Sequence, residues 1–265
     1  MALAPPRSLT PTKVSSFTSC PLAFRLAVID RLPEPPAVPA VKGTLVHSAL
    51  EGLHWNHPPG RRSEAAAQAE LDVAWAKLRR TADFLGLGLD DEGAEAFVSD
   101  AADLVRNYFQ LEDPDRVRSV GVELCLESEL DHLRLRGVID RLDVTDDGEL
   151  VVVDYKTGKA PSERFEHAKL GGVHTYALLC ERVLGRTPVA VRLLFLREPV
   201  ELIARPSGQT IRGQRQRTVA VWRAIERACA TEDFRPRPSA LCRFCNFQPL
   251  CPAQGGSLPS AAPAC

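Results

Sequence analysis

The amino-acid sequence predicts an α/β protein with a mixed central β-sheet flanked by helices. Three observations support this fold class. Segments with helical periodicity fill the chain up to about residue 111, and residues 117–155 then change to runs of strand character. A helix, a strand and another helix follow that meander. Helices, then paired strands, then helix and strand is the order expected of a mixed sheet covered by helices.

The N-terminal part of the chain is predicted to be helical after a poorly ordered beginning. Residues 1–12 are rich in Pro, Ala and Thr, and we expect them to lack regular structure. In the first helix Ser15 or Ser16 is the expected N-cap, and a Pro-rich loop at 32–39 separates this helix from the next. The four helices predicted in this part cover residues 15–29, 43–55, 62–80 and 92–111.

The second half of the chain is predicted to supply the sheet. Asp146–Gly148 has the sequence D-D-G, which is typical of a turn between two paired strands. Strands are expected at residues 117–129, 133–144, 149–155, 189–196 and 200–204, the last two pairing with each other. Two helices, at residues 162–184 and 208–231, complete the set.

Length and composition are those of an ordinary globular chain. With 265 residues, 45% of them hydrophobic and 25% charged, it holds one sizeable core. We find no apolar run long enough to span a bilayer and no signal-peptide core, so we expect a cytoplasmic protein without a membrane partner. The net charge of −1 counts against nonspecific coating of nucleic acid, but it is compatible with a local basic groove.

Three charged side chains near the ends of two neighbouring strands form the candidate catalytic centre. Asp140 lies toward the end of one predicted strand and Asp154 at the end of the next, and Lys156 follows two residues later on the same face. Paired carboxylates suit Mg²⁺ or Mn²⁺, and the ammonium group is placed to activate water or neutralise charge on a scissile phosphate. A single Asp beside a turn is usually just solvated. Asp154 differs because it follows the apolar run Leu150–Val153, where an unpaired charge is costly.

The two strand motifs together carry a family resemblance. G-V-I-D-R-L-D at 137–143 and V-V-V-D-Y-K-T-G at 151–158 resemble the PD-(D/E)XK nuclease superfamily, in its RecB-like and Cas4-like exonuclease branch. The resemblance implies a restriction-endonuclease-like core over residues 13–241, with a helical insertion at about 56–112. It implies that metal and catalytic roles fall on Asp140, Asp154, Lys156 and the main-chain carbonyl of Tyr155.

A histidine, His47, is also expected near the metal, and an acid, Glu123, is a further candidate. K-G-T-L-V-H at residues 42–47 is similar to the first motif of this family, a helical G-x-x-x-H whose histidine, here His47, reaches the metal. Without the resemblance, a lone histidine on an amphipathic helix would be read as a packing or surface residue. Glu123 occupies a strand position where relatives often carry an acid, although an alternating strand also shows Glu on its outer face for no special reason.

The helix after the D-x-K strand usually carries Gln-x-x-x-Tyr in this family. Tyr176 is present here, and the resemblance implies that it contacts DNA or positions Lys156. Gly172 replaces the glutamine, which puts that residue's DNA contact in doubt unless His174 partly replaces it.

A cysteine cluster near the C-terminus has the spacing of a metal site. Cys242-x-x-Cys245-x₅-Cys251 supplies three thiolates, one short of a tetrahedral set, and Cys20 is the candidate fourth. The same family resemblance implies that these four hold a [4Fe–4S] cluster, closed by the segment 242–256, whereas four cysteines alone suit Zn²⁺ equally well. The tail 257–265, with Cys265, is expected to be disordered and uninvolved. The absence of an export signal points away from disulfides.

The sequence therefore predicts a metal-dependent deoxyribonuclease, directed at single strands or duplex ends, in DNA repair, recombination or CRISPR adaptation. A chain of this size has no room for a helicase, so a helicase or a CRISPR integrase is an expected partner. Two other classes stay open. One is a DNA-binding module that keeps the nuclease fold without catalysis. The complete set of Asp140, Asp154 and Lys156 argues against it, whereas the missing glutamine and the near-neutral charge keep it open. The other is a zinc-ribbon adaptor, which leaves the acid–lysine pair unexplained.

Overall fold

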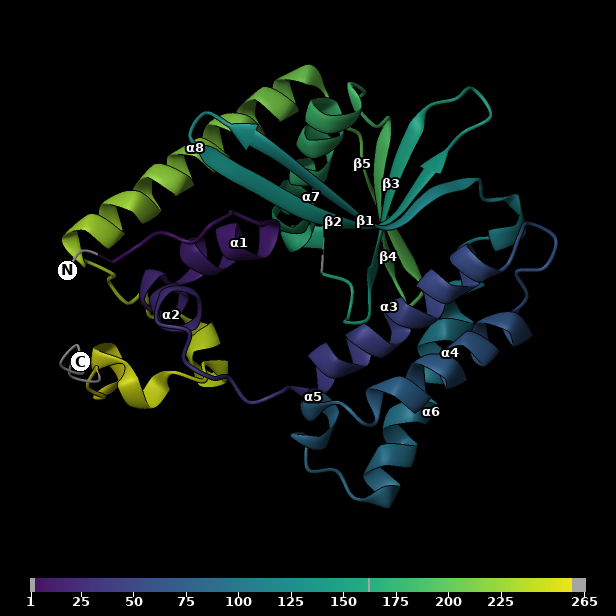
Figure 1. Ribbon diagram of the computed structural model, residues 1–265, viewed down its shortest axis with the longest axis horizontal. Helices are drawn as coiled ribbons and strands as arrows, with labels where there is room; N and C mark the ends of the chain where they lie inside the picture. The colour runs from purple at the N-terminus through teal and green to yellow at the C-terminus, as the bar shows by residue number, and fades with distance from the viewer. Residues whose placement is uncertain (1–2, 162, 259–265) are drawn as a thin grey trace. The chain divides into compact units, whose positions relative to one another are not determined.

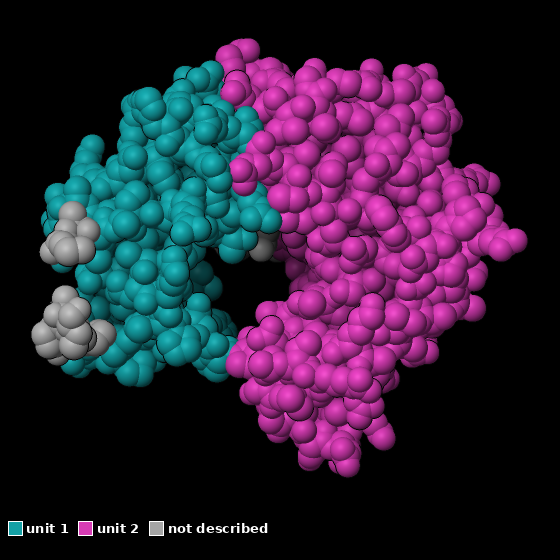
Figure 2. Space-filling model, viewed as in Figure 1, with its two compact units in different colours: residues 1–35, 128–136, 213–265 teal, residues 36–127, 137–212 magenta. Residues whose placement is uncertain are grey.

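The computed structural model describes residues 3–161 and 163–258 (Figure 1). The chain forms two compact units, shown in two colours in Figure 2. The larger unit contains residues 36–127 and 137–212, and the smaller unit contains residues 1–35, 128–136 and 213–265. Within the described ranges, no helix combines the length and apolar character needed to cross a lipid bilayer.

A five-stranded mixed sheet confirms the predicted fold class. The strands lie in the order β1 (Ser119–Leu130), β2 (Leu133–Val144), β3 (Leu150–Lys156), β4 (Ala190–Phe195) and β5 (Val200–Ala204). β3 pairs antiparallel with β2 and parallel with β4, and β4 pairs antiparallel with β5. The parallel pair arises because helix α7 (Glu163–Leu184) carries the chain back between β3 and β4, whereas a tight turn joins β2 to β3.

The turn between β2 and β3 sets which residues face each other. Gly148 has a φ of +81°, a left-handed conformation that a glycine adopts without a steric penalty, and its N–H donates to the carbonyl of Thr145 at 2.9 Å. The register runs from Val144 opposite Leu150 to Arg141 opposite Val153. Continued by one residue, this register places Asp140, inside β2, opposite Asp154 near the end of β3.

Three helices of the larger unit share one apolar core with the sheet. α3 (Val38–Asn56), α4 (Glu64–Leu78) and α6 (Asp91–Tyr108) bury side chains in the same cluster as Val153 and Tyr155 of β3. α3 begins before the expected start at residue 43, because Pro39 fits the first turn of a helix, where no N–H is required. The short helix α5 (Ala82–Leu85) and the 3₁₀ turn η2 (Pro114–Arg116) complete this unit.

The smaller unit begins with a helix that is broken where one was expected to continue. α1 (Pro11–Ser19) ends at Cys20, and α2 (Pro21–Phe24) and a π-helical turn (Arg25–Ile29) follow. Cys20 is extended, with φ −157° and ψ 105°, because the residue before a proline is driven out of the helical region. Leu9, within the stretch expected to lack structure, is fully buried and forms a bridge with Leu135.

The end of the chain is a long helix followed by short turns. α8 (Gly208–Thr231) covers the predicted range, and three 3₁₀ turns come after it, η3 (Ala240–Phe244), η4 (Gln248–Leu250) and η5 (Pro252–Gln254). Residues 259–265, most of the tail expected to be disordered, lie outside the described part of the chain.

Candidate active site

Three side chains from three different elements come together at one end of the sheet. His47 comes from α3, Glu123 from β1 and Asp140 from β2, and one ligand atom from each lies within 4.8 Å of the other two. His47 Nδ1 is 3.5 Å from Asp140 Oδ2. Two carboxylates and an imidazole, converging in this way, are donors suited to a divalent cation such as Mg²⁺ or Mn²⁺.

The main chain of Tyr155 lies between two of these side chains. Its N–H donates to Asp140 Oδ2 at 2.7 Å, and its carbonyl oxygen lies 3.1 Å from His47 Nε2. The imidazole nitrogen that carries no proton can bind a cation, either Nδ1 on the side of Asp140 or Nε2 beside the Tyr155 carbonyl. The structure thus places His47, Asp140 and the Tyr155 carbonyl next to one another.

Glu123 has a backbone conformation that an ordinary strand residue would not adopt. Its φ is +45°, which is left-handed and costs a non-glycine residue about 1–3 kcal/mol. Before Glu123 the exposed residue, Val120, has an even number, and after it the exposed residues Cys125 and Glu127 have odd numbers. The face of β1 that is exposed therefore changes at this point. Such a local break re-aims one side chain, and here it sends the Glu123 carboxylate toward His47 and Asp140.

Asp154 and Lys156 stand beside this group at the end of β3. The Asp154 side chain is almost completely buried and forms an ion pair with Lys156 Nζ, whose own side chain is 41% exposed. Tyr176, on α7, is hydrogen-bonded to Asp154 through its side chain, and burial together with the negative charges of Asp154 and Asp140 raises the pKa of its hydroxyl. The tyrosine therefore donates its proton to the carboxylate, while the lysine remains reachable from solvent.

The two buried aspartates oppose each other electrostatically. Burial and the nearby charge of Asp154 raise the pKa of Asp140 to about 6, although His47, the Tyr155 N–H and Lys156 act in the opposite direction. Burial also raises the pKa of Glu123. Carboxylates crowded in this way favour a bound cation, which removes their mutual repulsion. The donor set therefore fits a divalent metal ion.

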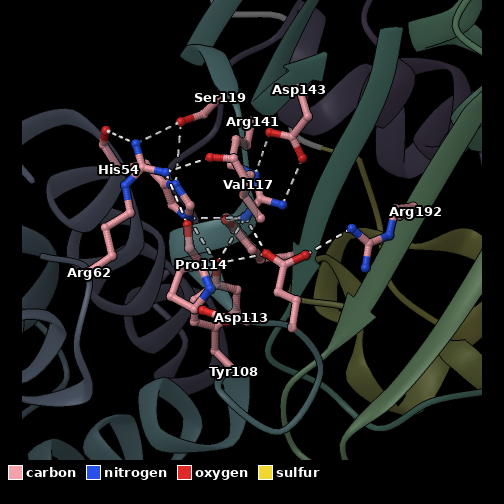
Figure 3. A network of polar contacts seen from close by, with 12 residues as sticks. His54, Arg62, Tyr108, Asp113, Pro114, Val117, Ser119, Arg141, Asp143 and Arg192 are labelled. Atoms are coloured by element: carbon pink, nitrogen blue, oxygen red, sulfur yellow. Dashed lines mark hydrogen bonds and ion pairs between the residues drawn. The ribbon is translucent and has the colours of Figure 1, made fainter. Parts of the chain in front are cut away.

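A buried polar cluster lies on the other face of β3, against α3 and α6 (Figure 3). At its centre is Arg141, which is fully buried and contacts Asp143 through both Nε and Nη2 at 2.8 Å. Its Nη1 faces Glu112, Tyr108 and His54. Burial would raise the pKa of Glu112, but the charges of Arg141 and Arg192 outweigh it and lower that pKa to about 2.

His54 makes this cluster sensitive to acid. Burial, helped by the charges of Arg141 and Arg62, lowers its pKa to about 2, whereas a histidine in an unfolded chain titrates near 6.5. Below pH 6.5 the unfolded chain therefore takes up a proton that the folded chain does not, and stability falls as the pH drops. We expect the free energy of unfolding to fall between pH 7 and pH 5 by about 2 kcal/mol more in the wild type than in His54→Gln. Urea titrations of both proteins at the two pH values measure this, and equal losses would contradict it.

The four predicted cysteines also lie together, within the smaller unit. Cys20, Cys242, Cys245 and Cys251 all carry free thiols and line one cavity of about 180 Å³. The main-chain N–H of Arg237 donates to Cys20 Sγ at 3.5 Å, and that of Ser239 donates to Cys242 Sγ at 3.3 Å. Donation from the backbone to sulfur is favourable for thiolates, so this donor set fits a sulfur-ligated metal centre.

Sequence reasoning missed the polar cluster around Arg141. The signal was present in D-R-L-D, where three charges fall in a strand whose neighbours are apolar, yet only Asp140 was given a role. One acid that compensates Arg141, Asp143, lies in the same motif, but the other partners, Glu112, Tyr108 and His54, come from distant parts of the chain and no local pattern predicts them. Gly172, which stands in place of the expected glutamine, is exposed on α7.

Comparison with known proteins gives one family and several relatives. A family model described as the PD-(D/E)XK nuclease superfamily matches residues 8–252. The chain is 27% identical to the Gene 69 protein of Mycobacterium phage D29, over 91% of this chain and 95% of that protein. It is 26% identical to the Gene 69 protein of Mycobacterium phage L5, over 94% of this chain and 97% of that protein.

A solved structure shares the fold. The crystal structure of a candidate exonuclease from Eubacterium rectale superposes with a TM-score of 0.58, covering 91% of this chain and 88% of that one, at 11% sequence identity.

Proposed function

The chain belongs to the PD-(D/E)XK nuclease superfamily, and from this premise we propose that it is a metal-dependent deoxyribonuclease that hydrolyses phosphodiester bonds in single strands or at DNA ends. The observation that carries the proposal is the convergence of His47, Glu123 and Asp140 beside the Asp154–Lys156 pair. Cation ligands and an accessible ammonium group at one place are what phosphodiester hydrolysis requires.

Each side chain has a role in this proposal. Asp140, Glu123, His47 and the Tyr155 carbonyl would hold Mg²⁺ or Mn²⁺, and Asp154 would face the same ion from β3. When bound, the ion supplies positive charge at the scissile phosphate and lowers the pKa of water. Lys156 orients the attacking water or neutralises charge on the phosphate. Tyr176 fixes Asp154, and through it Lys156, by hydrogen bonding.

We propose a [4Fe–4S] cluster for the four cysteines, which is also the cofactor of the RecB-like and Cas4-like branch that the chain resembles. The four thiols line one cavity of about 180 Å³, where all four can face one bound group. Zn²⁺ is the alternative, since it takes the same four ligands.

DNA repair or recombination is the proposed setting, with CRISPR adaptation as the alternative, and a helicase or an integrase as the proposed partner. A second candidate function is a strand-guiding module without catalysis, which the exposed Gly172 in place of glutamine favours.

The test is an assay on end-labelled single-stranded and duplex DNA. We expect the intact protein to release labelled products with Mn²⁺ or Mg²⁺ and to release none after chelation with EDTA, because the carboxylates need the ion to bind the phosphate. Products from strands labelled at either end give the polarity. Binding of DNA without cleavage under every metal condition would refute the nuclease proposal and favour the strand-guiding module.

A further inference from the structure

We propose that Arg141 is a positioning residue for the metal site: it holds the Tyr155 side chain on one face of β3, so that the main-chain N–H and carbonyl of Tyr155 stay aligned with Asp140 and His47. The inference rests on the proposed metal site and adds the buried cluster that supports it. All of the residues concerned lie in the larger unit.

The guanidinium group of Arg141 is held almost rigidly. Asp143 receives two parallel hydrogen bonds from it at 2.8 Å, and Glu112 pairs with its Nη1. Glu112 is in turn bound at 2.8 Å by Arg192 of β4, so the buried charges balance. The planar guanidinium group can satisfy all of these partners in only one orientation. Its position next to β3 is therefore fixed by them.

Tyr155 connects Arg141 to the proposed metal ligands Asp140 and His47. Arg141 Nη1 donates to the Tyr155 hydroxyl at 2.8 Å, and the Tyr155 side chain is 2% exposed. The main-chain N–H of the same tyrosine donates to Asp140 at 2.7 Å, and its carbonyl oxygen lies 3.1 Å from His47. Because adjacent strand residues point to opposite faces, anchoring the Tyr155 ring on one side fixes the backbone between Asp154 and Lys156.

Stabilising the fold does not by itself account for the buried charged cluster around Arg141. Buried ion pairs contribute little net stability, because desolvation offsets their attraction, and apolar residues of similar size often serve the core equally well. A charged cluster at this position does have a geometric consequence, since it ties β2, β3 and β4 together directly behind the ligands. Groups that orient metal ligands through hydrogen bonds commonly change metal affinity or activity by about 10–100-fold when removed.

The matched test compares Tyr155→Phe with Tyr108→Phe in the full-length protein. Each variant removes one buried hydroxyl that lies within hydrogen-bonding distance of Arg141 Nη1, at 2.8 Å and 3.0 Å respectively, and the Tyr108 hydroxyl also donates to Glu112. Only Tyr155 has its main chain between His47 and Asp140. Both variants leave the Arg141–Asp143 pair in place, whereas substitution of Arg141 itself risks misfolding. We expect the Mn²⁺ dissociation constant, measured by calorimetry without DNA, to rise about 10-fold in Tyr155→Phe and less than about 2-fold in Tyr108→Phe.

Kinetics give a second readout of the same inference. In Tyr155→Phe we expect kcat to fall while KM for DNA changes little, since the DNA contacts are untouched. A folded Tyr155→Phe that binds Mn²⁺ as the wild type does would overturn the positioning role and leave the proposed nuclease standing. Equal loss of Mn²⁺ affinity in both variants would also overturn it, because a general loosening of the core would then suffice. A wild type that neither binds Mn²⁺ nor cuts DNA would refute both the inference and the proposed function.

Discussion

Replacing Lys156 by alanine is expected to lower the rate of DNA cleavage by about 10³-fold while leaving the fold intact. The ammonium group forms an ion pair with the buried Asp154, yet its own side chain is 41% exposed at the last position of β3. Its removal therefore creates no cavity in the core. What is lost is a positive charge beside the proposed metal ligands, where it would act on the attacking water or the scissile phosphate. The measurement is single-turnover cleavage of labelled single-stranded DNA with saturating Mn²⁺.

The control for this variant is Lys159→Ala. Lys159 is an exposed lysine three residues further along the chain, so its removal changes the net charge equally without touching the site. We expect Lys159→Ala to cleave at nearly the wild-type rate, and both variants to remain folded in the absence of denaturant. If Lys156→Ala digests DNA as fast as Lys159→Ala, the catalytic role assigned to Lys156 is wrong.

The parts of the fold that could be predicted depend on local patterns. The D-D-G turn places β2 against β3, and the apolar run that precedes Asp154 identifies a buried strand, so the meeting of Asp140 and Asp154 follows from neighbouring residues. The break at Cys20 could have been read from Pro21, since the residue before a proline leaves the helical region.

The parts that could not be predicted depend on distant contacts. Nothing near Glu123 signals its left-handed backbone, because the strain is maintained by packing between elements that the sequence does not place. The second acid that pairs with Arg141 is similar, since Glu112 follows α6 and is itself bound by Arg192 of β4. A charged residue inside an apolar strand indicates that a partner exists, but only the folded structure shows which one.

The cysteine site has the largest expected effect on stability. Cys20 and the segment Cys242–Cys251 come from opposite ends of the chain, yet they line one cavity of the smaller unit. An apolar cluster of Leu22, Leu26 and Phe247 packs against it. A metal centre that joins Cys20 to Cys242 closes a loop of about 220 residues, which removes roughly 5 kcal/mol of chain entropy from the unfolded state. Binding free energy at such a site is also folding free energy.

Cys242→Ser is therefore expected to lose the metal centre and to destabilise the smaller unit by about 4 kcal/mol or more. Cys125→Ser is the matched control, because Cys125 is exposed on β1 and lies outside the cavity. After anaerobic purification, the wild type and Cys125→Ser should contain about four iron atoms per chain and absorb broadly near about 400 nm, and Cys242→Ser should do neither. Hydrogen exchange at the main chain of α2 and η3 should then quicken in Cys242→Ser alone. One zinc ion per chain, without colour, would instead assign the site to Zn²⁺. If the wild type contains neither iron nor zinc and exchanges its amide hydrogens as fast as Cys242→Ser, the proposed metal centre is wrong. Equal exchange rates would mean that replacing Cys242 does not destabilise the smaller unit.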